Sequence, residues 1–428
     1  MHVNKLLRTY RQVTKRCFLT LCVAVCWALI VFIAASANAY EFPPYKGLSL
    51  KVEGQVAESY SNNVTYASKN EDRVEDLLTN FNLGAALKYE RPRHSVGLSG
   101  LLNRQILTEE GTLENSSERV NVIFRNEFTP YDRVTVSNTY THTQVPGTID
   151  EGFNREQCEK LFDLFGGDQA VRLFPECEKF TEEFGRISGR LDSYSNTVNL
   201  TYGRDIAEHL NITAGYQFSR RWSPEEGTTD SDQNGVSFSA NYELSAATVF
   251  SMSYDYENSR YETGSNIYIQ RVRAGIRQYI TERLYAEARA GMDVLSNNDE
   301  STDIEAALSG EVDKKTAARL AYSRGVDISP QTEDVFKNWQ VSGNVSRALL
   351  KDLNISLSGF YGQGDFVSAG TTDTFVGAAF DISYNFWQDK LGKSVKGHMG
   401  YTYSNLTSTD EDRNYSRVGV GAGLSVSF

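Results

Sequence analysis

The last fifteen residues of the chain, 414–428, alternate between apolar side chains and small or polar ones. The apolar positions are Val418, Val420, Ala422, Leu424, Val426 and Phe428. A period of two is that of a β-strand with one apolar face. Because no chain follows to cover that face, we expect it to lie against an apolar surrounding, which lipid supplies. The alternative interpretation is the edge strand of a soluble sandwich.

The same alternation continues through the chain from residue 47 onward, in segments of about ten to fourteen residues that polar connections separate. It predicts about eighteen strands, and the last of them is the closing segment. The predicted strands are 47–60, 76–90, 96–102, 120–128, 134–144, 191–203, 210–221, 234–244, 248–261, 266–280, 284–295, 303–312, 316–326, 335–349, 353–364, 372–387, 394–405 and 414–428.

The connections between these segments are sorted by length. Short turns such as 91–94, 130–133 and 281–283 follow even-numbered strands, whereas longer loops rich in Asp, Asn, Ser and Thr follow odd-numbered ones. Outer-membrane barrels have this asymmetry and an even strand count, whereas a soluble sandwich has no reason for it. We therefore expect an all-β fold, a transmembrane antiparallel up-and-down β-barrel of about eighteen strands. Closure would satisfy every backbone hydrogen bond within the membrane.

Residues 1–39 have the pattern of a secretory signal peptide. Five basic residues and no acidic ones precede an uncharged apolar run over 17–37, and Ala37-Asn38-Ala39 is a small-x-small cleavage site. The run is also long enough to span a membrane as an uncleaved helix. The cleavage triplet and the strand pattern after it favour the signal. We predict a signal peptide over 1–39 and an outer-membrane barrel over 40–428.

The charge balance narrows the range of partners. Without residues 1–39 the chain has 38 basic and 55 acidic side chains, a net charge of −17. That balance disfavours nucleic-acid binding. The 24 tyrosines suit the aromatic girdles that membrane barrels carry at both interfaces. We therefore expect the chain to lie in the bacterial outer membrane, surrounded by its lipid.

Charges of both signs gather on the polar faces of the segments between residues 248 and 326. The predicted pore-lining residues are Asp255, Glu257, Arg271, Arg273, Arg277, Glu287, Arg289 and Asp293. Glu305, Glu311 and Arg319 follow on the polar faces of the next two segments. Neighbouring strands would bring opposite charges to cross-strand distance. On the lipid face each arginine would cost roughly 2–4 kcal/mol near the midplane, so we expect the interior orientation. A structural ladder along the interior wall and a pore lining that sorts solutes are compatible interpretations.

The longest connection, 145–188, holds the two cysteines that lie outside the signal segment, Cys158 and Cys177. In an exported protein one such pair predicts a disulfide, and metal binding by two thiols is the weaker alternative. Asn154 can cap a helix, with Gln157 at the reciprocal position. We expect two short amphipathic helices joined by the disulfide, either packed on the outer rim or folded into the mouth as a constriction.

The chain offers little for catalysis or for cofactors. Its histidines outside the signal segment are His94, His142, His209 and His398, and none belongs to a Ser/His/Asp or metal-ligand pattern. The acidic loops 225–232, 297–303 and 407–412 have carboxylates that suit Ca²⁺, but none has the spacing of a calcium loop. We expect no enzyme activity, no cofactor and no metal.

The closing Gly-Leu-Ser-Val-Ser-Phe resembles the carboxy-terminal signal of outer-membrane barrels, which implies that the barrel assembly machinery reads Phe428. With Glu-Ser-Tyr-Ser-Asn-Asn-Val at 58–64 and repeated strand-turn-strand units, the chain resembles porins often encoded at exopolysaccharide and exosortase loci. The resemblance implies exopolysaccharide export, with a periplasmic polysaccharide-export protein as partner. The insertion over 145–188 does not match that family pattern. The alternatives are a diffusion porin for small solutes and a structural or adhesive barrel with a filled lumen.

Overall fold

The computed structural model describes residues 47–64, 75–107, 114–143, 192–224, 229–296, 299–328, 334–388 and 393–427. They contain eighteen β-strands and one short 3-10 helix, η4 (Glu411–Arg413). The strands are β1 (Leu48–Ser61), β2 (Asp76–Arg91), β3 (His94–Leu107), β4 (Glu114–Glu127), β5 (Asp132–Thr143), β6 (Ser193–Ala207), β7 (Leu210–Trp222), β8 (Ser231–Ser245), β9 (Thr248–Tyr261), β10 (Asn266–Tyr279), β11 (Leu284–Leu295), β12 (Glu300–Asp313), β13 (Thr316–Ile328), β14 (Val335–Ala348), β15 (Leu353–Phe366), β16 (Thr372–Gln388), β17 (Ser394–Ser408) and β18 (Tyr415–Ser427).

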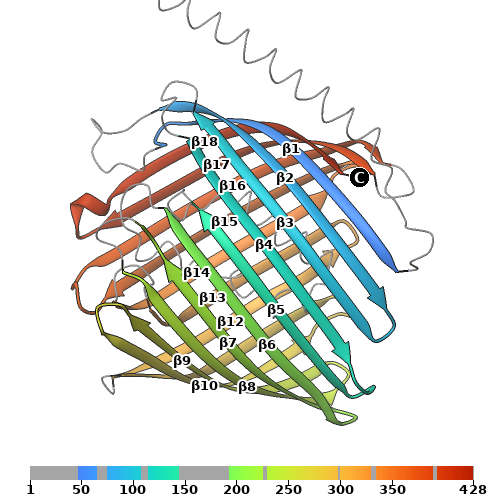
Figure 1. Cartoon of the computed structure of the whole chain (residues 1–428), viewed down its shortest axis with the longest axis vertical. Coiled ribbons are helices and arrows are strands. Elements are labelled where there is room, and N and C mark those ends of the chain that lie inside the picture. Colours follow the sequence, from blue (N-terminus) through green and yellow to red (C-terminus); the bar gives the residue numbers. More distant parts are fainter. Residues whose placement is uncertain are drawn as a thin grey trace, which may run out of the picture.

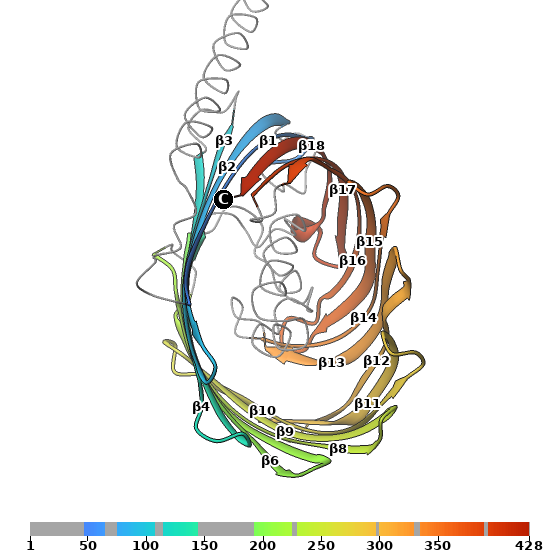
Figure 2. The same cartoon turned by 90° about the vertical axis from the view of Figure 1, so that its right-hand side faces the viewer.

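Each strand pairs antiparallel with the next strand along the chain, and β18 returns to pair with β1. The closing register runs from Glu53 opposite Ser427 to Ser61 opposite Gly419. Figure 1 shows the long tilted strands from the side, and Figure 2 shows them as a closed ring. The predicted fold, an antiparallel up-and-down barrel of eighteen strands, is confirmed. Closure leaves no edge strand with unpaired backbone groups.

Some strands extend farther toward the long loops than the apolar alternation indicates. β4 begins at Glu114 rather than at residue 120, and β12 begins at Glu300 rather than at residue 303. These added residues are polar. They continue the backbone pairing of their hairpins without needing an apolar face, which is why hydropathy alone did not reveal them.

Large apolar side chains cover the outer face of the barrel. All eighteen strands expose at least one, and the exposed fraction reaches 61% at Met252. One such residue from each strand is Leu50, Leu83, Leu98, Val122, Val136, Leu200, Tyr216, Phe238, Met252, Val272, Met292, Leu308, Leu320, Val341, Leu357, Phe380, Met399 and Val420. A continuous apolar belt around a closed barrel requires lipid, because exposed to water it would be a very large apolar patch.

Exposed aromatic side chains gather near the end of the barrel that has the short turns, here called the turn end. They are Phe128, Tyr131, Tyr242, Phe250, Tyr384, Phe386 and Trp387. Aromatic rings with one polar edge collect at the membrane interface, so this ring of residues marks one border of the lipid-facing belt. In outer-membrane barrels the short turns lie at the periplasm.

The short turns are closed by side chains that accept backbone hydrogen bonds. Thr129 Oγ1 accepts the N–H groups of Tyr131 and Asp132 at 3.1 and 3.0 Å. At the β12–β13 turn, Asp313 Oδ1 accepts the N–H of Lys315 at 2.7 Å. Thr and Asp stabilise tight turns in this way, which explains their place between the strands.

Three predictions fall on residues outside the described ranges: the signal peptide over 1–39, the bridge between Cys158 and Cys177 in 145–188, and the role of Phe428. They stay predictions. Within the described ranges, no helix is long and apolar enough to cross a membrane.

Candidate functional site

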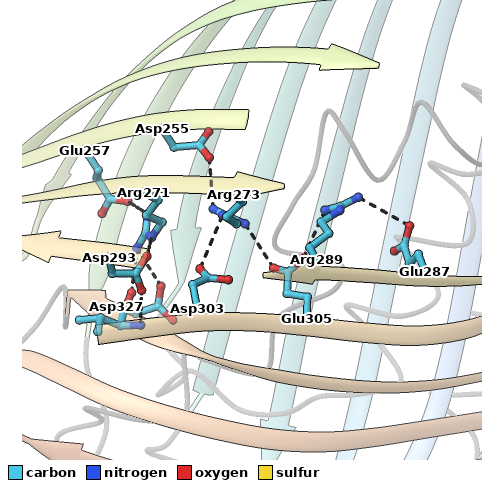
Figure 3. A network of polar contacts seen from close by, with 11 residues as sticks. Asp255, Glu257, Arg271, Arg273, Glu287, Arg289, Asp293, Asp303, Glu305 and Asp327 are labelled. Atoms are coloured by element: carbon cyan, nitrogen blue, oxygen red, sulfur yellow. Dashed lines mark hydrogen bonds and ion pairs between the residues drawn. The ribbon is translucent and has the colours of Figure 1, made fainter. Parts of the chain in front are cut away.

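The three arginines of β10 lie on its interior face. Val272 and Ile276, which alternate with them, are 47% and 39% exposed on the outer face. The side chains of Arg271, Arg273 and Arg277 are only 9%, 16% and 25% exposed. Neighbouring positions on a strand face opposite sides, so the guanidinium groups point into the barrel. Figure 3 shows Arg271 and Arg273 with their carboxylate partners.

Arg271 is the most enclosed of the three and contacts three other strands. Its guanidinium donates a 3.0 Å hydrogen bond to Glu257 on β9, and its Nε lies 3.8 Å from Asp293 on β11. Nη2 donates to the backbone oxygen of Val326 on β13 at 2.8 Å and lies 3.4 Å from Asp327. One buried cation therefore connects β9, β10, β11 and β13.

Arg273 repeats this arrangement one step closer to the turn end. Its Nη2 donates to Asp255 Oδ2 at 3.2 Å, and its Nη1 donates to Glu305 Oε1 at 3.3 Å. Its Nε lies 3.6 Å from Asp303 Oδ2. Arg273 thus lies among three carboxylates from two strands, β9 and β12.

Arg277 and Arg289 continue the network toward the turn end. Arg277 donates from Nε and Nη2 to one oxygen of Glu287, at 3.0 and 2.9 Å, and its guanidinium lies 4.7 Å from the centre of the Tyr285 ring. Arg289 donates to Glu305 at 3.2 Å and lies 3.6 Å from Glu287. Arg277 faces Glu287 directly in the strand register, as Arg289 faces Glu305.

The structure brings all eight predicted pore-lining residues into one network and adds three carboxylates to it. We call this network the charged ladder. Its members are Asp255, Glu257, Arg271, Arg273, Arg277, Glu287, Arg289, Asp293, Asp303, Glu305 and Asp327. Seven carboxylates thus surround four guanidinium groups, and negative charge is in excess. Their role in solute passage stays a prediction.

The outer end of β13 leaves the barrel wall. β12 and β13 stop pairing at Arg324, whereas β13 and β14 stay paired up to Ile328. β13 is three strands from β10 in the sheet, so about 14 Å would separate them along the wall, farther than an arginine side chain extends. The direct hydrogen bond from Arg271 to Val326 therefore requires this end of β13 to bend inward over the charged ladder. In Figure 2 it lies inside the ring.

We call residues 325–328 and 335–338 the inturned tip. Two buried side chains of the wall hold its backbone, because the carbonyl of Val326 accepts from Arg271 and its N–H donates to Asp293 at 3.0 Å. An apolar contact lies beside this polar one. It consists of Ile269, Leu295, Val326, Ile328 and Val335. Polar and apolar contacts together fix the tip where it narrows the interior.

A third contact attaches the tip to the rim. Lys337 Nζ on β14 donates a 2.6 Å hydrogen bond to Asp299 in the loop between β11 and β12. That hydrogen bond, helped by the charge of Lys337, lowers the pKa of the Asp299 carboxyl below its ordinary value. The rim contact therefore persists in mildly acidic solution and weakens only as pH falls through that lowered pKa.

A second set of inward side chains lies at the outer end of β14–β18. It is an apolar cluster of Phe336, Phe360, Phe366, Phe375, Leu406 and Tyr415, all buried. Arg413 of η4 lies over the Phe366 ring at 4.6 Å and 2.5 Å from the fully buried Asp373. The loop between β17 and β18 therefore folds inward, and Figure 2 shows η4 in red inside the ring.

Sequence reasoning missed Asp303 and Asp327 because each stands at or beyond the end of its predicted strand. It also missed the apolar cluster. A signal for the cluster exists in the sequence. Phe336, Phe360 and Phe375 occupy strand positions that face the interior with the polar residues, whereas the lipid-facing residues of these strands occupy the alternate positions. Aromatic residues at interior-facing positions near the end of a strand indicate a loop that folds into the barrel.

The described ranges contain no group of three or more His, Cys, Asp or Glu side chains arranged to hold a metal ion. In the charged ladder, guanidinium groups occupy the positions between the carboxylates that a cation would otherwise take. The chemistry available there is weak electrostatic contact with passing ions or polar solutes.

No model of a known protein family matches the sequence, and no curated protein matches it. The barrel is similar to that of OccK2 (OpdF) from Pseudomonas aeruginosa, with 9% identity and a TM-score of 0.47 over 89% of this chain and 98% of that one. OccK1 (OpdK) from the same organism has 11% identity and a TM-score of 0.45, over 89% and 99%. The siderophore receptor PirA from Acinetobacter baumannii has 8% identity and a TM-score of 0.44, over 88% and 80%.

The location of the protein follows from its own two faces. The sheet closes without an edge, and every strand exposes apolar side chains on the outside. Ionised side chains gather on the inside. Only a bilayer suits that outer surface, and closed barrels of this kind belong to outer membranes. The chain is a transmembrane antiparallel β-barrel of the bacterial outer membrane.

Proposed function

We propose that this barrel is a porin that passes small water-soluble solutes across the outer membrane and prefers cations to anions. The observation that carries the proposal is the charged ladder, in which seven carboxylates outnumber four guanidinium groups on the interior face. An excess of carboxylate on the interior wall raises the local concentration of cations and repels anions.

The pairing of the charges supports passage rather than tight capture. Each ladder carboxylate already contacts an arginine, as Asp255 contacts Arg273 at 3.2 Å and Glu287 contacts Arg277 at 2.9 Å. A passing ion therefore meets several partly neutralised sites in sequence rather than one strong site. Conduction requires this balance, because a solute that binds too tightly does not leave.

Exopolysaccharide export with a periplasmic partner protein stays a prediction from the sequence resemblance. No contact described above favours it over small-solute passage. The same holds for a structural or adhesive barrel, whose defining feature would be a lumen that conducts nothing.

The ion preference can be measured with the purified protein in planar bilayers under a KCl gradient. We expect a reversal potential displaced toward the K⁺ equilibrium potential. The double variant Asp255→Asn/Glu305→Gln removes two ladder carboxylates that are about one third exposed, and it should move the reversal potential toward that of Cl⁻. The matched control is Glu58→Gln, which removes a carboxylate from the outward-facing side of β1 and should leave the reversal potential unchanged.

Each outcome of this experiment bears on the proposal. An absence of ion conductance would contradict porin function, and a filled structural barrel would then take its place. A conductance without cation preference, or one that Glu58→Gln changes as much as the double variant does, would contradict the role of the charged ladder.

A further inference from the structure

A cavity of about 390 Å³ lies on the interior wall at the turn end of β12–β17, away from the inturned tip. Four of its polar residues, Ser346, Asn354, Ser356 and Ser383, alternate with lipid-facing ones such as Val345, Leu357 and Tyr384, which places these four inside the barrel. Sites for small molecules in proteins occupy about 300–1,000 Å³. The cavity is therefore large enough for a small solute, and its place near the short turns is the periplasmic mouth.

Beside its charged residues, the cavity is lined by five neutral side chains with hydrogen-bonding groups. The hydroxyl and amide side chains are Thr316, Ser346, Asn354, Ser356 and Ser383. A primary amide offers two donors beside an acceptor, and each hydroxyl offers a donor and an acceptor. Neighbouring hydroxyl groups on one solute can use such paired donors and acceptors, whereas an ether or a hydrocarbon cannot.

The charges around the cavity are nearly balanced and are partly occupied by contacts within the protein. Among the described residues, three acidic and four basic side chains line the cavity. Among the acidic ones, Glu311 accepts a 2.6 Å hydrogen bond from Arg283, and Asp313 accepts from the N–H of Lys315 and the hydroxyl of Thr316. This balance contrasts with the excess of carboxylate in the charged ladder, and it gives no strong preference for a charged solute.

We propose that this cavity binds small uncharged polyhydroxylated solutes, of the size of a mono- or disaccharide, at the periplasmic mouth of the barrel. The proposal rests on the proposed porin function, because the cavity would then be a station on the path of the solute. None of the lining residues that the structure describes is aromatic, so their contact with the solute relies on hydrogen bonds. Binding is therefore weak, which suits passage.

The test uses the full barrel, one cavity variant and one matched control. The cavity variant is Asn354→Ala/Ser356→Ala/Ser383→Ala. The control makes the same three changes at interior-facing positions of β8, outside the cavity. It is Asn241→Ala/Ser237→Ala/Ser239→Ala. The probe is trehalose, an uncharged disaccharide, and hexaethylene glycol serves as a solute without neighbouring hydroxyl groups.

Two readouts are measured: the duration of trehalose-induced interruptions of the single-channel current, and saturation-transfer NMR contact between trehalose and the barrel in detergent micelles. We expect interruptions by trehalose that outlast those by hexaethylene glycol. The cavity variant should shorten them by about tenfold or more, since it removes up to three hydrogen bonds. The β8 control should keep them, with the same open-channel conductance.

The outcomes separate the cavity from the porin function. If the barrel conducts ions but the cavity variant keeps its trehalose interruptions, or the β8 control loses them equally, the cavity is not the binding site and the porin proposal stands. If the barrel conducts no ions, the porin proposal fails, and the NMR measurement alone tests whether the cavity binds trehalose. If only the cavity variant loses the NMR contact with trehalose, the result supports the site. If the wild-type barrel shows no contact, or both variants keep or lose it equally, the result overturns the site.

Discussion

Replacement of Arg271 by methionine should detach the inturned tip and destabilise the barrel. The substitution keeps much of the side-chain volume but removes the guanidinium. That removes the 2.8 Å hydrogen bond to the Val326 carbonyl and the contacts with Glu257, Asp293 and Asp327. Asp293 is fully buried. Loss of one partner from a buried ion network costs about 3–5 kcal/mol, because the remaining charges lose their compensation.

Two assays measure this loss. Urea unfolding, followed by heat-modifiable mobility or tryptophan fluorescence, should shift to a midpoint lower by about 1–1.7 M, for a slope of about 3 kcal/mol per molar. In planar bilayers the open current of Arg271→Met should switch among several levels, because the tip is no longer held at Val326.

Arg277→Met is the matched control for this experiment. It is the same chemical change on the same face of β10, and Arg277 contacts Glu287 and Tyr285 but not the tip. It should cost about 1.5–3 kcal/mol, the value of hydrogen bonds to a charged group, and leave the current steady. A wild-type urea midpoint and current in Arg271→Met, or an equally disturbed current in Arg277→Met, would contradict the role of Arg271 in holding the inturned tip.

Three further predictions concern other parts of the chain. Arg413→Ala leaves the fully buried Asp373 without its 2.5 Å ion pair, so the free energy of unfolding should fall by about 3 kcal/mol, and an unchanged urea midpoint would speak against the inward-folded loop. Cys158 and Cys177 should be joined in a non-reduced digest examined by mass spectrometry, and two free thiols would exclude the bridge. Deletion of Phe428 should reduce the folded, protease-resistant form in the outer membrane, and a normal amount of it would contradict an assembly signal.

The strand pattern could be predicted because it depends on local rules. A period of two marks each strand, and tight turns fix the register of each hairpin, so opposite charges on adjacent strands must meet. Arg277 does face Glu287 and Arg271 does face Asp293. The charged ladder was thus accessible to sequence reasoning up to the identity of most of its members.

The inward bends could not be predicted, because they depend on contacts between distant segments. Arg271 and Val326 are 55 residues apart, and only the folded barrel shows that one holds the other. The separation of β12 from β13 beyond Arg324 leaves no mark in the alternation of either strand. The cavity at the turn end has the same origin, since its lining comes from several strands and none of them is unusual alone.

The two faces of β10 should meet water on the inside and lipid on the outside, and cysteine modification can measure this. Arg277→Cys and Ile276→Cys are made in a background in which Cys158 and Cys177 are serine. Each barrel is then exposed in a bilayer to a cationic, water-soluble methanethiosulfonate reagent while the K⁺ current is recorded. Modification at residue 277 should reduce the current, and residue 276 should give no response. A response at residue 276 alone, or none at either position, would contradict an interior that carries water and ions past the charged ladder.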